Sequence, residues 1–150
     1  MGADSELMAT VLARVQEKWR ASSVPLNPGA SATELNRLRD LLGIELPADV
    51  QRFYAVANGM ADHAGAGVYL VSFWSIDRIC REQDVCSGSD AMGAFADVAF
   101  ADVLIYSWCF RFRVRAQRLH VVADGQPWEF DDFSSFLHAY LTKPQDLGVQ

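Results

Sequence analysis

The chain has 150 residues, 51% of them hydrophobic, and a formal net charge of −6. The length and the hydrophobic fraction predict a single domain, 1–150, whose core needs neither disulfides nor a cofactor. The acidity disfavours a nucleic-acid partner, because such affinity rests on Lys and Arg releasing counterions from phosphates, and it favours a basic protein partner. No apolar run approaches the roughly 20 residues of a membrane helix, so we expect no membrane partner.

The cysteines and the start of the chain bear on localisation. The chain has three cysteines, an odd number without a repeating spacing, which argues for reduced thiols: Cys80, Cys86 and Cys109. The first segment mixes acids and bases through its apolar positions, unlike a secretory signal. We therefore expect a cytoplasmic protein.

Apolar residues at helical spacing predict three helices before residue 60. The first begins at Asp4 or Ser5 and ends before a loop at 22–31, which contains two prolines and a glycine. The second begins at the capping box of Ser31 and Glu34 and ends at Gly43.

The third predicted helix lies between Leu46-Pro47 and Asn58-Gly59. Proline suits the first turn of a helix, and Asn or Gly tolerates the left-handed conformation that ends one. We expect Val50, Phe53, Tyr54 and Ala57 to face the core. If Gly59 has a positive φ, replacing it should destabilise the fold.

The second half of the chain predicts strands. The apolar segment 68–76 predicts a central strand, and Ser75 can cap a short helix from Ile76 to about Asp84. The small residues of 85–97 indicate an exposed loop.

Two paired strands are expected at 100–107 and 109–115. In the second, apolar residues alternate with Arg111, Arg113 and Arg115, which predicts one core face and one solvated face. A hairpin-like pair at 118–130 and a last helix capped by Asp131 or Asp132 complete an α+β domain with a mainly antiparallel central sheet, flanked by N-terminal helices and a C-terminal helix.

The excess negative charge lies in the middle of the chain. Acids and bases balance before Gly43 and again after Leu104. Between them only Arg52, Arg78 and Arg81 face nine acids: Glu45, Asp49, Asp62, Asp77, Glu82, Asp84, Asp90, Asp97 and Asp102. The simplest interpretation is a solvated acidic surface, and the alternative is a surface that attracts a basic partner.

The sequence signals for a catalytic site or a metal site are weak. Cys80, Cys86 and His63 match no zinc-ligand spacing, so we expect no metal. His63, His120 and His138 fall in three different predicted elements and no G-x-S-x-G motif is present, so we expect no enzyme, although a small hydrolase stays open as a third reading. The aromatic residues Trp74, Trp108, Trp128, Tyr69 and Tyr106 are more simply core than recognition residues.

Several segments in this order resemble the SUKH superfamily, the Smi/Knr-like proteins. The similar segments are LNPGASATELNRLRDLLGIELPADVQRFYAVANG, then YLVSFWSI and Phe100-Ala101-Asp102, and finally WEFDDFSSFLHAYL. The resemblance implies an α+β fold without catalysis and a role in binding another protein, most often as an immunity protein that neutralises a toxin.

Resemblance and charge together give one hypothesis. The chain would bind a basic toxin domain, such as a nuclease, in equal ratio, with Glu82, Asp84, Asp90 and Asp97 steering its approach. The alternative is an adaptor or regulatory scaffold that binds an endogenous cellular protein.

Overall fold

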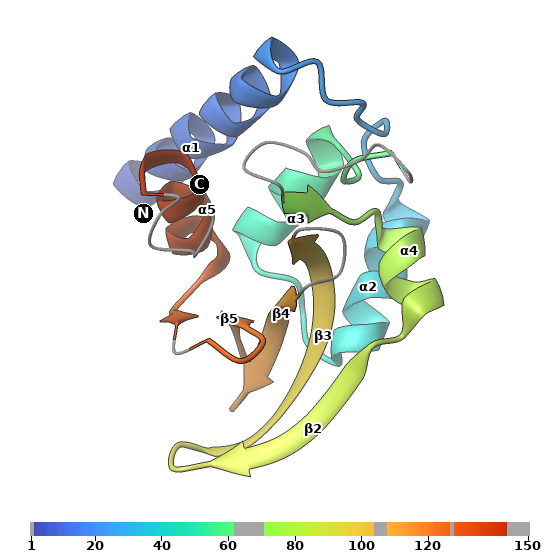
Figure 1. Cartoon of the computed structure of the whole chain (residues 1–150), viewed down its shortest axis with the longest axis vertical. Helices are drawn as coiled ribbons and strands as arrows, with labels where there is room; N and C mark the ends of the chain where they lie inside the picture. Colours follow the sequence, from blue (N-terminus) through green and yellow to red (C-terminus); the bar gives the residue numbers. More distant parts are fainter. Residues whose placement is uncertain (1, 62–70, 104–107, 127, 144–150) are drawn as a thin grey trace.

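The fold is an α+β domain in which helices cover one face of an antiparallel sheet (Figure 1). The structure is a computed structural model that describes residues 2–61, 71–103, 108–126 and 128–143. In chain order the elements are α1 (Gly2–Ala21), α2 (Ala32–Leu42), α3 (Ala48–Val56), β1 (Val71–Phe73), α4 (Ile76–Glu82), β2 (Val85–Asp90), β3 (Gly93–Val103), β4 (Trp108–Arg115), β5 (Arg118–Ala123), β6 (Glu129–Phe130) and α5 (Phe133–Thr142).

The helix ends follow the sequence signals closely. Ser31 and Glu34 form both hydrogen bonds of the capping box, and Gly43 ends α2 in the left-handed conformation. Ser75 caps α4, and Asp132 rather than Asp131 caps α5 by accepting from the Ser135 amide. The predicted caps at these positions are confirmed.

Gly59 has the positive φ, +70°, that was expected, but it does not end α3. The helix ends at Val56, and Ala57 is already extended. The Asn58 side chain instead donates to Glu34 of α2 at 2.8 Å and accepts from the Ile76 amide of α4 at 2.8 Å. The Asn58 side chain therefore ties the starts of α2 and α4 together.

The sheet has the order β1-β3-β4-β5-β6, and β2 also pairs with β3. This is possible because β3 is long: β1 pairs with residues 101–103 and β2 with residues 93–98 of the same edge. The strand predicted at 68–76 is described only at Val71–Phe73, and it lies at the sheet edge, not at the centre as expected.

The loop prediction at 85–97 is wrong. These residues form β2, a two-residue turn and the first part of β3, and together they make a curved hairpin at the lower end of the molecule (Figure 1). Small residues gave no strand pattern because no β2 side chain is buried. Periodicity shows a strand only when one of its faces packs against something.

The core lies between the sheet and the helices α1, α3 and α5. It is rich in aromatic side chains, and Phe73, Phe100 and Phe136 contact one another at centroid distances of 5.7–6.2 Å. Trp19 is completely buried and donates its indole N–H to the Tyr140 hydroxyl at 2.9 Å, which ties α1 to α5. Trp74 is buried as predicted, Trp108 and Trp128 are half-buried, and Tyr69 and Tyr106 lie outside the described residues.

Candidate partner-binding surface

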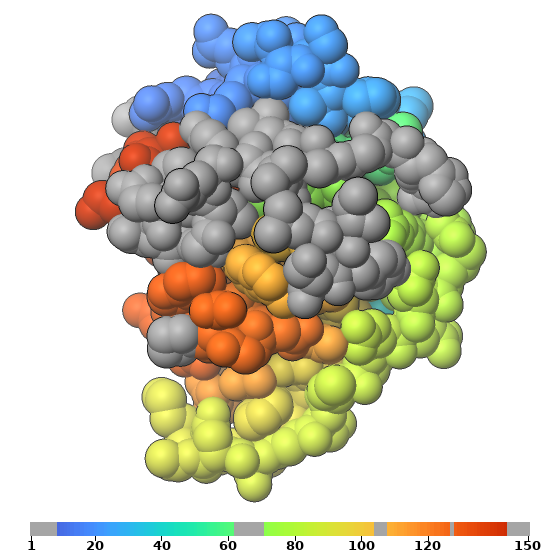
Figure 2. Space-filling model, in the orientation of Figure 1, coloured from blue at the N-terminus to red at the C-terminus, as the bar shows by residue number. Residues whose placement is uncertain are grey.

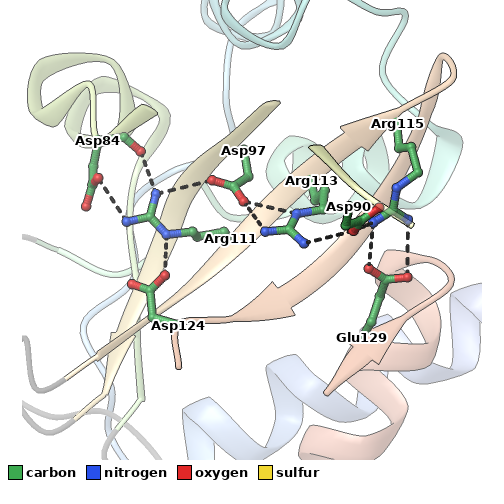
Figure 3. A network of polar contacts seen from close by, with 8 residues as sticks. All are labelled: Asp84, Asp90, Asp97, Arg111, Arg113, Arg115, Asp124 and Glu129. Atoms are coloured by element: carbon green, nitrogen blue, oxygen red, sulfur yellow. Dashed lines mark hydrogen bonds and ion pairs between the residues drawn. The ribbon is translucent and has the colours of Figure 1, made fainter. Parts of the chain in front are cut away.

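The face of the sheet opposite the aromatic core carries a row of alternating charges (Figure 3). In β4 the buried Phe110 and Phe112 face the core, so the alternation of a strand directs the three arginines to the opposite face. We call the row the ion-pair ladder, and its members are Arg111, Arg113, Arg115, Asp84, Asp90, Asp97, Asp124 and Glu129.

The prediction that the arginine face of β4 is solvated is wrong. Arg111 and Arg115 are only 7% and 5% exposed. Carboxylates from other segments of the chain lie against them: Asp84 and Asp124 against Arg111, and Asp90 and Glu129 against Arg115. The ring of Phe95 lies over Arg113, with its centroid 3.7 Å from the guanidinium carbon. The hydrogen bonds from their other N–H groups stabilise these buried arginines, while Arg115 Nε has no hydrogen-bond partner among the described residues.

Arg111 forms one end of the ladder. Its Nε donates to Asp124 at 2.6 Å, and its two terminal nitrogens donate to the backbone oxygen and a carboxylate oxygen of Asp84, each at 2.9 Å. Burial opposes the charge of this guanidinium, but the hydrogen bonds to Asp124 and Asp84 outweigh it and raise its pKa above the ordinary value. Arg111 thus fixes the start of the hairpin to the β5 end.

Arg113 and Arg115 continue the row toward the hairpin tip. Arg113 donates to Asp97, its direct neighbour on β3, at 2.7 and 3.1 Å. Arg115 donates to Asp90 at 2.8 Å and to Glu129 at 3.2 and 3.3 Å, and the Glu129 hydrogen bond is the main cause of its raised pKa. The Met92 amide and Arg115 both lower the pKa of Asp90.

The structure separates the four predicted steering residues. Asp84 and Asp90 lie in the ladder with side chains 40% and 39% exposed. Glu82 lies outside it, at the end of α4, with a side chain 39% exposed and 3.9 Å from Arg78. Asp97 also lies in the ladder, but its side chain is only 2% exposed and accepts hydrogen bonds from Arg113.

Other acids of the middle segment are also structural. Asp102 accepts from the Trp74 indole at 2.7 Å, and Asp49 accepts from the Ser134 amide at 2.9 Å at the start of α5. Asp77 pairs with Arg81 at 2.8 Å. The imbalance in space is smaller than the nine-to-three imbalance along the chain, because the β4 arginines lie against three of the middle acids, Asp84, Asp90 and Asp97.

Sequence reasoning missed the ladder arginines together with Asp124 and Glu129. The signal that could have found them is the match between two rows of opposite charge, in which Asp97 stands opposite Arg113 in the strand register. Beside the ladder, Asp124, Trp128 and Glu129 line a hollow of about 280 Å³ with a mostly polar wall.

The described residues that were weighed as metal or catalytic candidates belong to different elements of the fold. Within the described ranges, no group of three or more His, Cys, Asp or Glu side chains is placed to hold a metal ion. His120 lies on the ladder face of the sheet, His138 is exposed on α5 at the other face, and His63 is outside the described residues. All three cysteines are free thiols.

In comparisons with known proteins, no family model matches the chain and no curated protein is significantly similar to it.

Among the described helices, none combines the length and the hydropathy needed to cross a bilayer.

Proposed function

We propose that the chain is a protein-binding module that acts as an immunity protein and neutralises a basic toxin domain by binding it in equal ratio. The resemblance to the SUKH superfamily supports this proposal, and so does the α+β fold that the resemblance implies. We also propose that the protein acts in the cytoplasm, where its three thiols stay reduced.

The observation that carries the proposal is the charge of the ion-pair ladder. Three guanidinium groups face five carboxylates, which leaves a net charge of −2 within the ladder, and Arg118, opposite Arg115 in the strand register, adds one positive charge to the same face. Four of the five carboxylates, those of Asp84, Asp90, Asp124 and Glu129, have side chains 31–40% exposed.

The ladder also holds these carboxylates in place before any partner arrives. Arg111 and Arg115 fix them by hydrogen bonds of 2.6–3.3 Å. A partner that binds ordered side chains loses less conformational entropy, and complementary charge raises the association rate. A basic domain therefore fits this surface better than a neutral or acidic one.

The test is affinity capture from the native cell, with washes of rising ionic strength and mass spectrometry of the retained proteins. The proposal expects a basic, toxin-like domain in equal ratio that salt releases, because exposed charges are screened by salt. Recovery of an ordinary cellular protein would favour the adaptor function instead. Recovery of no basic protein at low salt would contradict the proposal.

A further inference from the structure

We propose that the outer edge of β2 receives an extended, basic segment of the partner protein as an additional strand of the sheet. The inference rests on the proposed function, because it assumes a protein partner, and it names the chemistry of that partner. β2 lies at the lower end of the molecule in the space-filling view (Figure 2).

The backbone of β2 offers open hydrogen-bonding groups at alternate residues. The Ala99 amide donates to the Asp84 oxygen at 3.1 Å, and the register continues from there through Cys86–Asp97, Gly88–Phe95 and Asp90–Gly93. In an antiparallel pair, hydrogen-bonded and non-hydrogen-bonded pairs alternate. The amides and carbonyls of Ser87 and Ser89 therefore point away from β3, toward the outer edge.

Nothing in the described chain protects this edge. All six residues of β2 are exposed, and β3 is its only strand partner within the described ranges. The segment Val85–Asp90 contains no lysine and no proline, the residues that commonly prevent edge strands from pairing. Its central side chains are small, so the backbone of another chain can approach it.

The charges of Asp84 and Asp90 decide whether a second copy of this chain or a basic partner fits the β2 edge better. If two copies paired antiparallel about Ser87, Asp84 of one copy would stand opposite Asp90 of the other, and like charges opposite each other are destabilising. A partner strand with Lys or Arg at both positions would face carboxylates that are still 40% and 39% exposed. The favoured occupant therefore carries two basic residues six positions apart, separated by uncharged residues.

A peptide of that pattern tests the inference directly. The probe is acetylated and amidated Thr-Arg-Thr-Val-Thr-Val-Thr-Arg-Thr, and its matched control has Glu in place of both Arg. Hydrogen exchange of individual amides is measured by NMR at rising peptide concentration. The expected result is several-fold slower exchange at Ser87 and Ser89 with the Arg peptide, little change at Gly88, and no protection by the Glu peptide.

Three results would overturn the inference. They are an absence of protection at Ser87 and Ser89 up to millimolar peptide, equal protection by both peptides, and protection that rises with protein concentration alone. The last would assign the edge to a second copy of the chain.

A variant pair supplies the second test. Ser87→Pro removes an outward amide while leaving the pairing with β3, and Ser87→Thr keeps that amide. We expect Ser87→Pro to abolish the peptide-induced protection at Ser89 and Ser87→Thr to retain it. Equal protection in both variants would contradict strand addition.

The two proposals fail in distinguishable ways. A captured partner whose affinity is unchanged by Ser87→Pro would leave the proposed function standing and remove strand addition. Failure to capture any basic protein would remove the proposed function, whatever the peptide does.

Discussion

Gly59 is a position where both conformation and space require glycine. Its φ is +70°, and a Cβ there would lie 2.7 Å from the Ser75 amide nitrogen and closer still to the Trp74 carbonyl oxygen. We expect Gly59→Ala to lower the free energy of unfolding by more than the roughly 1–3 kcal/mol typical of a strained backbone alone, as measured by urea denaturation.

Gly43 provides the matched control for that prediction. Its φ is +73°, but a Cβ there would meet nothing within 4 Å. Gly43→Ala should therefore show the conformational cost without the collision. Equal destabilisation by the two variants would show that the contact with Trp74 has no energetic effect.

The cysteines should differ in reactivity because they differ in burial. Burial is the main cause that raises the pKa of Cys109 to about 12, with the nearby Asp124 carboxylate adding to it. Since the thiolate is the reactive form, Cys109 should stay unmodified by iodoacetamide in the folded protein up to about pH 9, while the exposed Cys86 reacts. Mass spectrometry of the labelled peptides would check this, and labelling of Cys109 at the Cys86 rate would contradict it.

Single residues with local partners could be predicted from the sequence. The caps at Ser31 and Ser75 need only the three residues that follow them, so their patterns are visible in the chain. Asn58 could not be interpreted correctly in this way, because its partners Glu34 and Ile76 come from two other elements.

At the scale of elements, the wrong predictions for the β2–β3 hairpin and for the arginine face of β4 have a common cause. The alternation of β4 correctly predicted two faces, but it could not show what covers the arginines. Part of the cover comes from a hairpin without an apolar pattern, whose Asp90 pairs with Arg115, so the same missing signal hid both the strand β2 and part of the burial of the arginines. A polar face that is buried by ion pairs looks like a solvated face in the sequence.

The pair Arg113–Asp97 tests whether the ladder holds the hairpin. Asp97 is 2% exposed, and Arg113→Met leaves this buried carboxylate with Arg111, 3.6 Å away, as its remaining ion-pair partner in the ladder, so the variant should lower the free energy of unfolding by roughly 3 kcal/mol. Arg113→Met combined with Asp97→Asn should recover much of that loss. The measurement is a double-mutant cycle by urea denaturation, and strictly additive losses would show that the pair does not interact.

At the scale of the whole molecule, acid should weaken the fold partly through the ladder. The pKa of Asp90 is lowered in the folded protein by the Met92 amide and by Arg115. Its stabilisation is therefore present above the unfolded pKa of about 3.9 and is lost as the pH falls through the lower folded value.

The Asp90→Asn variant tests this pH dependence. The free energy of unfolding should differ between the native protein and Asp90→Asn at pH 7, and the difference should shrink toward about pH 3 as the native carboxylate becomes neutral. Ser89→Ala, a neighbouring change without a titrating group, should run parallel to the native protein. A pH-independent difference for Asp90→Asn would contradict the role of its charge.

The ladder also bears on how the whole domain would meet a basic partner. The arginines hold acidic side chains of the hairpin at partly exposed positions, and the remaining charge is what a basic partner would meet. Neutralising Asp90 leaves the buried Arg115 still paired with Glu129, and Glu82 lies outside the ladder, whereas neutralising Asp97 removes the nearest carboxylate of Arg113. A revised charge variant should therefore leave Asp97 unchanged.

The most direct test of this account is the association rate with the captured partner as a function of ionic strength. One double variant joins Glu82→Gln with Asp90→Asn. The control double variant joins Glu17→Gln with Asp131→Asn and so neutralises two exposed acids that were not predicted to steer the partner. The account predicts a slower association and a weaker salt dependence for the first variant at low salt, and a smaller change for the control. Equal association rates for both variants and the native protein would contradict charge-steered binding at this surface.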